Sequence, residues 1–265
     1  MELIAKDIHV KLGRKEILHG VDFTARAGQL TAIVGPNGSG KTTLLRALTG
    51  ELPYKGSVMM NGHDCARIKA HQLAMMRAVL PQAANLAFPF TVLEVVRLGL
   101  TAGLASDTPD MSDRLPLEAL ARVGLAGFEG RHFHDLSGGE KQRVQLARVL
   151  VQIWEPMLEG QPRWLFLDEP VSALDIGHQL VVMQLARDYA AAGGGVIAVM
   201  HDLNLTAMFA DQVTLMDAGA IRATGTPDQV LTNERLSAAY HCQLQVNTLP
   251  PQGGAWILPQ AAEAG

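Results

Sequence analysis

The chain has 265 residues, of which 48% are hydrophobic and 18% charged, an ordinary soluble composition with enough apolar sequence for one large core. Its formal net charge of −4 argues against a dedicated nucleic-acid binder, because such proteins usually carry a basic surplus. Residues 1–10 lack the apolar core of a signal peptide, and no apolar run reaches the roughly 20 residues that span a bilayer, so work at a membrane would require a partner protein.

The N-terminal part of the chain predicts two antiparallel strands, at residues 3–10 and 18–25, joined by a turn at Gly13 and Arg14. A third apolar run, residues 30–34, leads into a glycine-rich segment and then a helical run at 44–48. After that helix, residues 53–56 are predicted to form a turn and residues 57–60 a short strand.

The glycine-rich segment has the pattern G-x-x-x-x-G-K-[ST] in the order strand, loop, helix, which predicts a phosphate-binding P-loop. It consists of Gly35, Pro36, Asn37, Gly38, Ser39, Gly40, Lys41, Thr42 and Thr43. Backbone N–H groups would surround an anion at the helix N-terminus, Lys41 would add a positive charge, and Thr42 would offer a hydroxyl to Mg²⁺. The alternative is a glycine-rich turn with an incidental lysine.

The middle of the chain changes character after Gln82, which ends the apolar run 78–82. Residues 85–91 are too rich in proline and aromatic side chains for a strand, and they predict an exposed loop. Helical spacing follows at residues 92–100 and 115–125, with a polar loop expected at 105–113. A helical insertion is therefore expected at about residues 82–154.

Ser137, Gly138, Gly139 and Glu140 precede a long helical run at residues 141–153. The spacing of Ser137 and Glu140 is that of a capping box, so these residues could simply begin a helix. Two glycines in the first turn, however, cost up to about 1 kcal/mol each relative to alanine, and they suit a close approach of the backbone to a ligand.

Two later apolar runs end in polar side chains. Residues 163–168 predict a buried parallel strand that ends at Asp168 and Glu169, and residues 196–200 predict another that ends at His201. Buried carboxylates need compensation, which Mg²⁺ beside a triphosphate would supply at Asp168, while Glu169 would deprotonate an attacking water. The alternatives are two exposed acids at a turn and a structural histidine. Strands at 212–216 and 220–224 and a helix at 233–240 complete the body, and the tail, residues 247–265, suggests no chemistry.

Together these stretches resemble the ATP-binding cassette (ABC) ATPases over residues 3–246. In family terms the Walker A loop is residues 35–43, the Q-loop glutamine is Gln82, the signature is residues 136–140, Walker B ends at Asp168, the D-loop is residues 172–175, and the switch histidine is His201. The resemblance implies an α/β fold: a P-loop NTPase core with a parallel sheet (residues 1–81 and 160–246), an N-terminal antiparallel β subdomain, and an inserted α-helical subdomain (82–159). All of these would form one ABC ATPase domain.

The resemblance also implies the roles of the site residues, with ATP and Mg²⁺ as cofactors. Two copies would pack head to tail, so that Ser137, Gly138, Gly139 and Asp175 of one copy complete the nucleotide site of the other. Within each copy, Glu169, His201 and Gln82 would be catalytic, and Thr42, Gln82 and Asp168 would hold the metal.

A narrower resemblance, over residues 86–99, 162–175 and 201–211, is to the ATP-binding subunits of bacterial haemin importers, within the iron-siderophore, haem and vitamin B12 importer group. It implies a transmembrane permease dimer as partner, a periplasmic substrate-binding protein as indirect partner, no nucleic acid, and a peripheral position on the cytoplasmic face of the inner membrane. Import of a ferric siderophore or vitamin B12 remains an alternative, as does a soluble ABC ATPase of an assembly complex such as an iron–sulfur cluster scaffold.

Three positions depart from the family pattern: Glu140 replaces a frequent glutamine, Val171 replaces threonine or serine, and Leu12 occupies the position of the adenine-stacking aromatic. The first two are expected to be tolerated. Aromatic stacking on a base is worth roughly 1–3 kcal/mol, so Leu12 predicts weaker ATP binding and poor discrimination of ATP from GTP.

Overall fold

A central sheet of six strands organises the computed structural model, which describes residues 1–82, 88–102, 109–249, 255 and 259–261. Its strand order is β12-β11-β3-β10-β9-β6, and all neighbours are parallel except β11 and β12. The strands are β3 (Leu30–Val34), β6 (Arg77–Leu80), β9 (Trp164–Asp168), β10 (Gly195–Val199), β11 (Gln212–Asp217) and β12 (Ala220–Gly225). Every residue of β3, β9 and β10 is buried, as expected for parallel strands covered on both faces.

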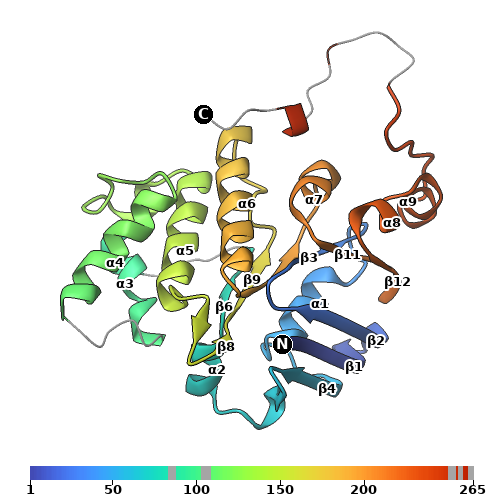
Figure 1. The fold of residues 1–265 in the computed structure, drawn as a ribbon, viewed down its shortest axis with the longest axis horizontal. Coiled ribbons are helices and arrows are strands. Elements are labelled where there is room, and N and C mark those ends of the chain that lie inside the picture. The colour runs from blue at the N-terminus through green and yellow to red at the C-terminus, as the bar shows by residue number, and fades with distance from the viewer. Residues whose placement is uncertain (83–87, 103–108, 250–254, 256–258, 262–265) are drawn as a thin grey trace.

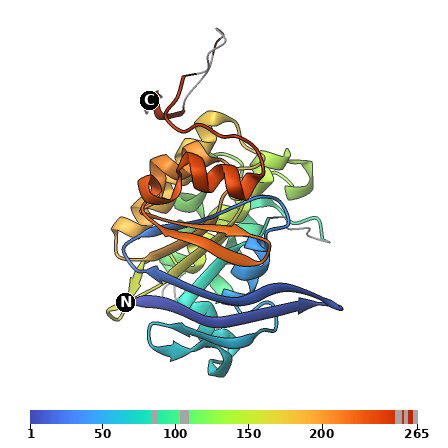
Figure 2. The same ribbon diagram turned by 90° about the vertical axis from the view of Figure 1, so that its right-hand side faces the viewer.

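A second, antiparallel sheet has the order β2-β1-β4-β5, and Figure 2 shows it as a separate layer beside the central sheet. Its strands are β1 (Glu2–Leu12), β2 (Lys15–Arg26), β4 (Lys55–Met60) and β5 (His63–Asp64), and a small hairpin is formed by β7 (Met157–Leu158) and β8 (Gln161–Pro162). Helix α1 (Lys41–Leu48) contacts strands of both sheets.

The other helices cover the central sheet and its ends. They are α2 (Ala70–Met76), α3 (Val92–Arg97), α4 (Pro109–Arg122), α5 (Gly138–Gln152), α6 (Ile176–Ala191), α7 (Leu203–Phe209), α8 (Pro227–Val230) and α9 (Asn233–Tyr240), with short 3₁₀ turns at Cys65–Arg67, Leu100–Ala102, Phe133–Asp135 and Pro259–Ala261. Figure 1 shows α3, α4 and α5 grouped on one side of the molecule, away from the antiparallel sheet. None of the described helices is long and apolar enough to cross a membrane.

Two hydrophobic cores lie on opposite faces of the central sheet. Along β9, Leu165 and Leu167 belong to the core formed with α3 to α7, whereas Trp164 and Phe166 belong to the core formed with α1 and the antiparallel sheet. Successive strand residues point to opposite faces, so a continuous apolar run is what a strand between two cores requires. The ends of these strands are thereby fixed in position, and they carry the polar residues of the site.

The expected architecture is confirmed: a parallel sheet, an antiparallel β layer at the N-terminus and a group of helices between β6 and β9. Two local predictions are wrong. Residues 53–56 do not form a turn throughout, because β4 already begins at Lys55, where backbone pairing with β1 overrides the weak strand propensity of Lys55 and Gly56. The loop expected at 105–113 is helical from Pro109, since proline is well tolerated in a first helical turn; residues 105–108 lie outside the described residues.

Two further predictions need adjustment. The helix expected at 92–100 ends at Arg97 and continues as a 3₁₀ turn at Leu100–Ala102. The loop expected at 85–91 is described only from Phe88 onward, and Phe88 is 70% exposed.

Candidate nucleotide site

The glycine-rich segment lies between β3 and α1, at the carboxyl edge of the central sheet. Gly40 precedes the first residue of α1 and has a φ of 101°, so the loop turns sharply into the helix. Gly35 has a φ of 147°, and a Cβ there would collide with the backbone carbonyl of Met216. Only glycine therefore lets the loop close against β11, and the loop's N–H groups surround a cradle at a helix N-terminus.

Lys41 is 5% exposed and is oriented by the loop itself. Its Nζ donates to the backbone oxygens of Gly35 at 2.8 Å and Pro36 at 2.9 Å. Burial lowers the pKa of Lys41, and the negative charges of Glu169 and Asp168 partly oppose that shift. A buried ammonium beside a ring of N–H donors suits a multiply charged anion.

The cradle fits a nucleotide phosphate on two further observations. The hydroxyl oxygen of Ser39 is buried and has no hydrogen-bond partner among the described residues, so a polar group of a ligand would satisfy it. A cavity of about 300 Å³ opens over the loop, lined by Asn37, Gly38, Gly40, Lys41, Thr42, Thr43, Glu169 and His201 and, at its other end, by Leu12, Lys15 and Ile17.

Thr42 and Asp168 meet at the floor of the site. The hydroxyl of Thr42 donates to Oδ1 of Asp168 at 3.0 Å, and Asp168 is 4% exposed. Burial raises the pKa of Asp168, and the hydrogen bond from Thr42 partly opposes that shift. A hydroxyl and a buried carboxylate are hard oxygen ligands, so this pair fits the Mg²⁺ that accompanies a nucleotide.

The carboxylate of Glu169 is held from both sides. Its Oε1 lies 2.6 Å from Nε2 of His201, and its Oε2 accepts from the amide of Gln82 at 2.8 Å. Its side chain is 15% exposed, so water reaches it from the cavity. Three strand ends deliver these residues, since Gln82 follows β6, Glu169 follows β9 and His201 follows β10. Parallel strands place their carboxyl ends at one edge, which brings all three together.

Leu12 lies where a base could contact it. It ends β1, is 46% exposed and lines the cavity together with Lys15 and Ile17 at the start of β2. Lys15 and Ile17 were not among the site residues that the sequence predicted. Their position directly after the Gly13–Arg14 turn was the available signal, because a hairpin places the residues on both sides of its turn next to each other.

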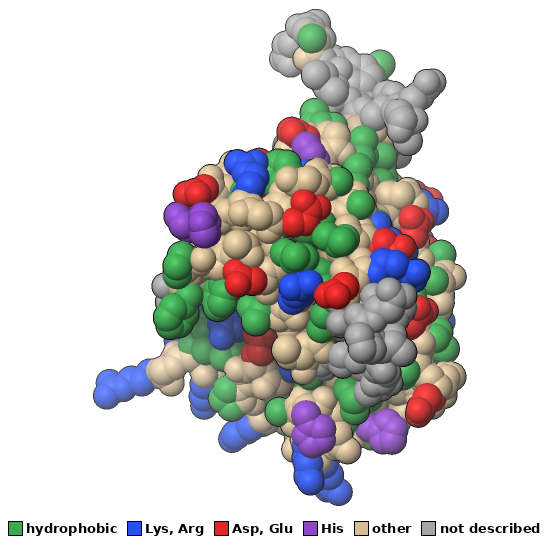
Figure 3. Space-filling view, turned by 90° about the vertical axis from the view of Figure 1, so that its left-hand side faces the viewer, with side chains coloured by type: hydrophobic (Ala, Val, Ile, Leu, Met, Phe, Trp, Pro, Cys, Tyr) green, Lys and Arg blue, Asp and Glu red, His purple; other side chains and the backbone are tan. Residues whose placement is uncertain are grey.

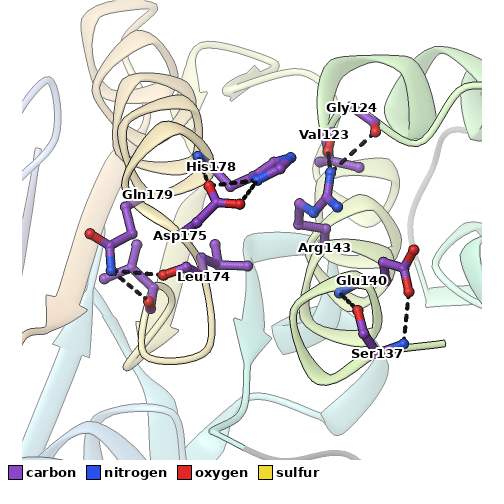
Figure 4. A network of polar contacts seen from close by, with 10 residues as sticks. Val123, Gly124, Ser137, Glu140, Arg143, Leu174, Asp175, His178 and Gln179 are labelled. Carbon is purple, nitrogen blue, oxygen red and sulfur yellow. Dashed lines mark hydrogen bonds and ion pairs between the residues drawn. The ribbon is translucent and has the colours of Figure 1, made fainter. Parts of the chain in front are cut away.

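The signature residues form a helix cap, as one of the two interpretations of the sequence proposed. The hydroxyl of Ser137 accepts from the N–H of Glu140 at 3.3 Å, and the Glu140 carboxylate accepts from the N–H of Ser137 at 2.7 Å (Figure 4). Gly139 has a packing reason to be glycine, because its Cβ would lie 2.9 Å from the backbone oxygen of Ala173. Gly138 has no such reason among the described residues, since its Cβ would meet none of their atoms within 4 Å.

The D-loop lies against the signature turn. Asp175 caps α6, accepting from the N–H of His178 at 2.9 Å, and the amide of Gln179 donates to the backbone oxygens of Leu174 and Val171 (Figure 4). The hydrogen bonds from the backbone N–H and the ring of His178 lower the pKa of Asp175. Val171 is 6% exposed and belongs to the hydrophobic core, so its side chain packs inside the protein.

The structure therefore brings the predicted residues together as two groups. P-loop residues, Glu169 and His201 line one cavity, and Asp168 and Gln82 join this group through hydrogen bonds to Thr42 and Glu169. Ser137, Gly138, Gly139 and Asp175 form a second group, in which Gly139 is half-buried and the other three are exposed, and none of them lines that cavity in the part of the chain that the structure describes.

Comparison with known proteins identifies this combination. The family model described as "ABC transporter" matches residues 18–172, more than half of the chain. The chain belongs to the ABC transporter family. This ABC protein is 63% identical over 260 residues to the "Hemin import ATP-binding protein HmuV" of Jannaschia sp. (strain CCS1), covering 98% of this chain and 95% of that protein. It is 59% identical over 262 residues to the protein of the same name from Roseobacter denitrificans, covering 99% of each.

Solved structures agree on the fold. The dimeric structure of MJ0796, described as a bacterial ABC transporter cassette, superposes with a TM-score of 0.73 at 25% identity, covering 85% of this chain and 98% of that one. The predicted resemblance to the ABC ATPases is confirmed, and the chain is an ATP-binding cassette with the ATPase fold of that family.

Proposed function

We propose that this ABC ATPase is the ATP-hydrolysing subunit of a haemin importer. The assignment of haemin as the substrate rests on similarity to proteins named for hemin import, one of which is 63% identical over 98% of this chain. The observation that carries the chemistry is the Glu169 carboxylate, held between Gln82 and His201 at the mouth of the phosphate cradle.

Hydrolysis of ATP follows from this geometry. Glu169 accepts the proton of a water molecule that attacks the γ-phosphate. Gln82 and His201 hold the two oxygens of the Glu169 carboxylate and so orient that carboxylate. Lys41 and the loop N–H groups bind the phosphates and stabilise the negative charge that spreads over them during transfer. Mg²⁺, when bound, would be held by Thr42, Asp168 and Gln82 and would supply further positive charge at the phosphates.

A second copy would complete the site. Ser137 and Gly138 are exposed, and the side chain of Asp175 is 71% exposed, so all three are accessible to another molecule. The capped N-terminus of α5 presents backbone N–H groups and the Ser137 hydroxyl to whatever faces it, which suits the γ-phosphate of a nucleotide held by the partner. The structure of MJ0796, a cassette of the same fold, is described as dimeric, which supports pairing of two copies here. The functional unit is proposed to be a head-to-tail dimer.

A permease dimer is the proposed membrane partner, docking near residues 82–97. Phe88 is 70% exposed there and contacts Phe90 edge to face, with ring centroids 6.1 Å apart. Figure 3 shows several exposed hydrophobic side chains on the face that carries α3 and α4. Exposed apolar groups of this kind mark protein–protein interfaces. The subunit would then lie on the cytoplasmic face of the bacterial inner membrane, with the periplasmic binding protein as an indirect partner.

The test of hydrolysis is Glu169→Gln, with Glu118→Gln on the exposed face of α4 as the matched control. We expect Glu169→Gln to bind ATP as the parent does and to lose turnover by at least about 100-fold, because a general base contributes that much. The control should keep the parent rate. Turnover of Glu169→Gln near the parent rate would remove Glu169 as the base.

The test of the substrate is transport. The chain should co-purify with a multi-spanning membrane protein, and the complex in vesicles should accumulate haemin in an ATP-dependent manner that Glu169→Gln abolishes. Accumulation of a ferric siderophore or cobalamin in preference to haemin would reassign the substrate. Co-purification with soluble assembly proteins alone would contradict the transport role.

A further inference from the structure

Gln142 lies one turn after the signature residues on α5 and contacts the backbone of Glu169. Its Nε2 donates to the Glu169 carbonyl oxygen at 2.8 Å. The helix that begins with Ser137 as its cap therefore also touches, within the same molecule, the residue that carries the carboxylate of the nucleotide site.

The backbone of Glu169 needs such support. Its φ is 53°, in the left-handed region that non-glycine residues seldom adopt and that occurs preferentially at active sites. Its N–H donates to the Val199 carbonyl oxygen at 3.1 Å, and besides the bond from Gln142 its own carbonyl oxygen accepts two longer bonds, from the Ser172 hydroxyl at 3.3 Å and the Ser172 N–H at 3.4 Å. The Gln142 amide thus supplies the shortest hydrogen bond to this carbonyl among the described residues.

The other end of the same amide indicates that packing alone does not explain a glutamine here. Oε1 of Gln142 is buried and has no partner among the described residues. A buried polar atom without a partner lowers stability, so an apolar side chain of similar size would pack at this position at lower cost. The amide is useful for the hydrogen bond that its nitrogen makes.

We propose that Gln142 is a positioning residue for ATP hydrolysis, which holds the Glu169 backbone and makes the placement of its carboxylate depend on α5. This inference rests on the proposed function, in which Glu169 is the base and Ser137 faces the nucleotide of the partner. Helix α5 then connects the two sites of a dimer: its cap contacts one nucleotide, and Gln142, one turn later, orients the base that acts on the other.

The chain offers a matched control on the same helix. Gln152 also donates through Nε2 to backbone oxygens of the core, those of Ala74 at 2.8 Å and Arg77 at 3.0 Å, far from Glu169 in the sequence. Gln142→Met and Gln152→Met each remove an amide that tethers α5 to the core, and methionine keeps the volume of the side chain. Only the first change releases the base.

The experiment compares steady-state Mg-ATP hydrolysis, ATP binding and thermal unfolding of the full-length parent and both variants. We expect Gln142→Met to lower kcat at least about tenfold, because small displacements of a catalytic group are costly, and to leave the Kd for ATP within about twofold. The ATPase rate of Gln142→Met should also rise less sigmoidally with ATP concentration than the rate of the parent. Gln152→Met should keep kcat and cooperativity, and thermal unfolding should show that both variants are folded.

Each outcome is decisive. Parent-like kcat for Gln142→Met, or an equal loss of kcat in both variants, would overturn the proposal. If Gln142→Met does not fold, Gln142→Ala is measured against Gln152→Ala by the same criteria. A parent that does not hydrolyse ATP, or an active Glu169→Gln variant, would instead count against the proposed function, so the two failures are distinguishable.

Discussion

Replacing Gly138 by alanine separates a role inside the chain from a role toward a partner. Gly138 is the first residue of α5, and within the part of the chain that the structure describes a Cβ there would meet no atom within 4 Å. Alanine is favoured over glycine in helices by up to about 1 kcal/mol, which corresponds to roughly 3 °C in Tm for a protein of this size. Gly138→Ala should therefore unfold at the parent temperature or slightly above it.

Activity should respond in the opposite direction. If the phosphate of a second copy lies against Gly138, the added methyl group occupies its place, and we expect ATP turnover to fall at least about tenfold although the fold is intact. The control is Gly139→Ala, whose Cβ would lie 2.9 Å from the Ala173 oxygen and 3.2 Å from Leu174. That variant should lose about 1–3 kcal/mol of stability through overpacking. Calorimetry and ATPase assays decide the matter, and parent-like turnover in Gly138→Ala would refute the reasoning.

Three further changes test the rest of the site. Leu12→Tyr should tighten ATP binding by about fivefold, since an aromatic ring can stack on the base, whereas Leu117→Tyr, at a leucine of similar exposure on α4, should leave the Kd unchanged. Unchanged affinity in Leu12→Tyr would place the base elsewhere. Burial raises the pKa of Asp168, so at pH values above the ordinary carboxyl pKa its charge lowers stability; Asp168→Asn should raise the Tm of the nucleotide-free protein by about 3 °C and abolish the extra stabilisation that Mg²⁺ gives with ATP. Scanning calorimetry at pH 5 and pH 8 would detect this, and a Tm gain that did not grow with pH would contradict it. The Ser137 N–H lowers the pKa of Glu140, which is therefore charged beside the exposed cap, so Glu140→Gln should keep the cap and lower the KM for ATP by about threefold at low salt, with the difference shrinking as salt screens the charge.

The placement of polar residues at the ends of buried strands was predictable because it depends only on the local sequence pattern. Apolar runs that end at Asp168 and His201 predicted buried parallel strands, and the structure places both runs in the central sheet as β9 and β10. The P-loop was equally predictable, since its glycines and Lys41 are consecutive in the chain. The errors at residues 53–56 and 109–113 concern boundaries, where pairing with β1 or the start of α4 overrode local propensity.

The sequence by itself determined the set of candidate site residues, but not which of them touch. Thr42 and Asp168 are 126 positions apart, and Gln82 and Glu169 are 87 apart, so their hydrogen bonds depend on the strand order of the central sheet. The contact of Gln142 with Glu169 had no signal in the sequence at all, because a glutamine on a helix is compatible with solvent, with a core carbonyl or with a cap. Periodicity reports the environment of one element, whereas partners across elements are decided only when those elements pack.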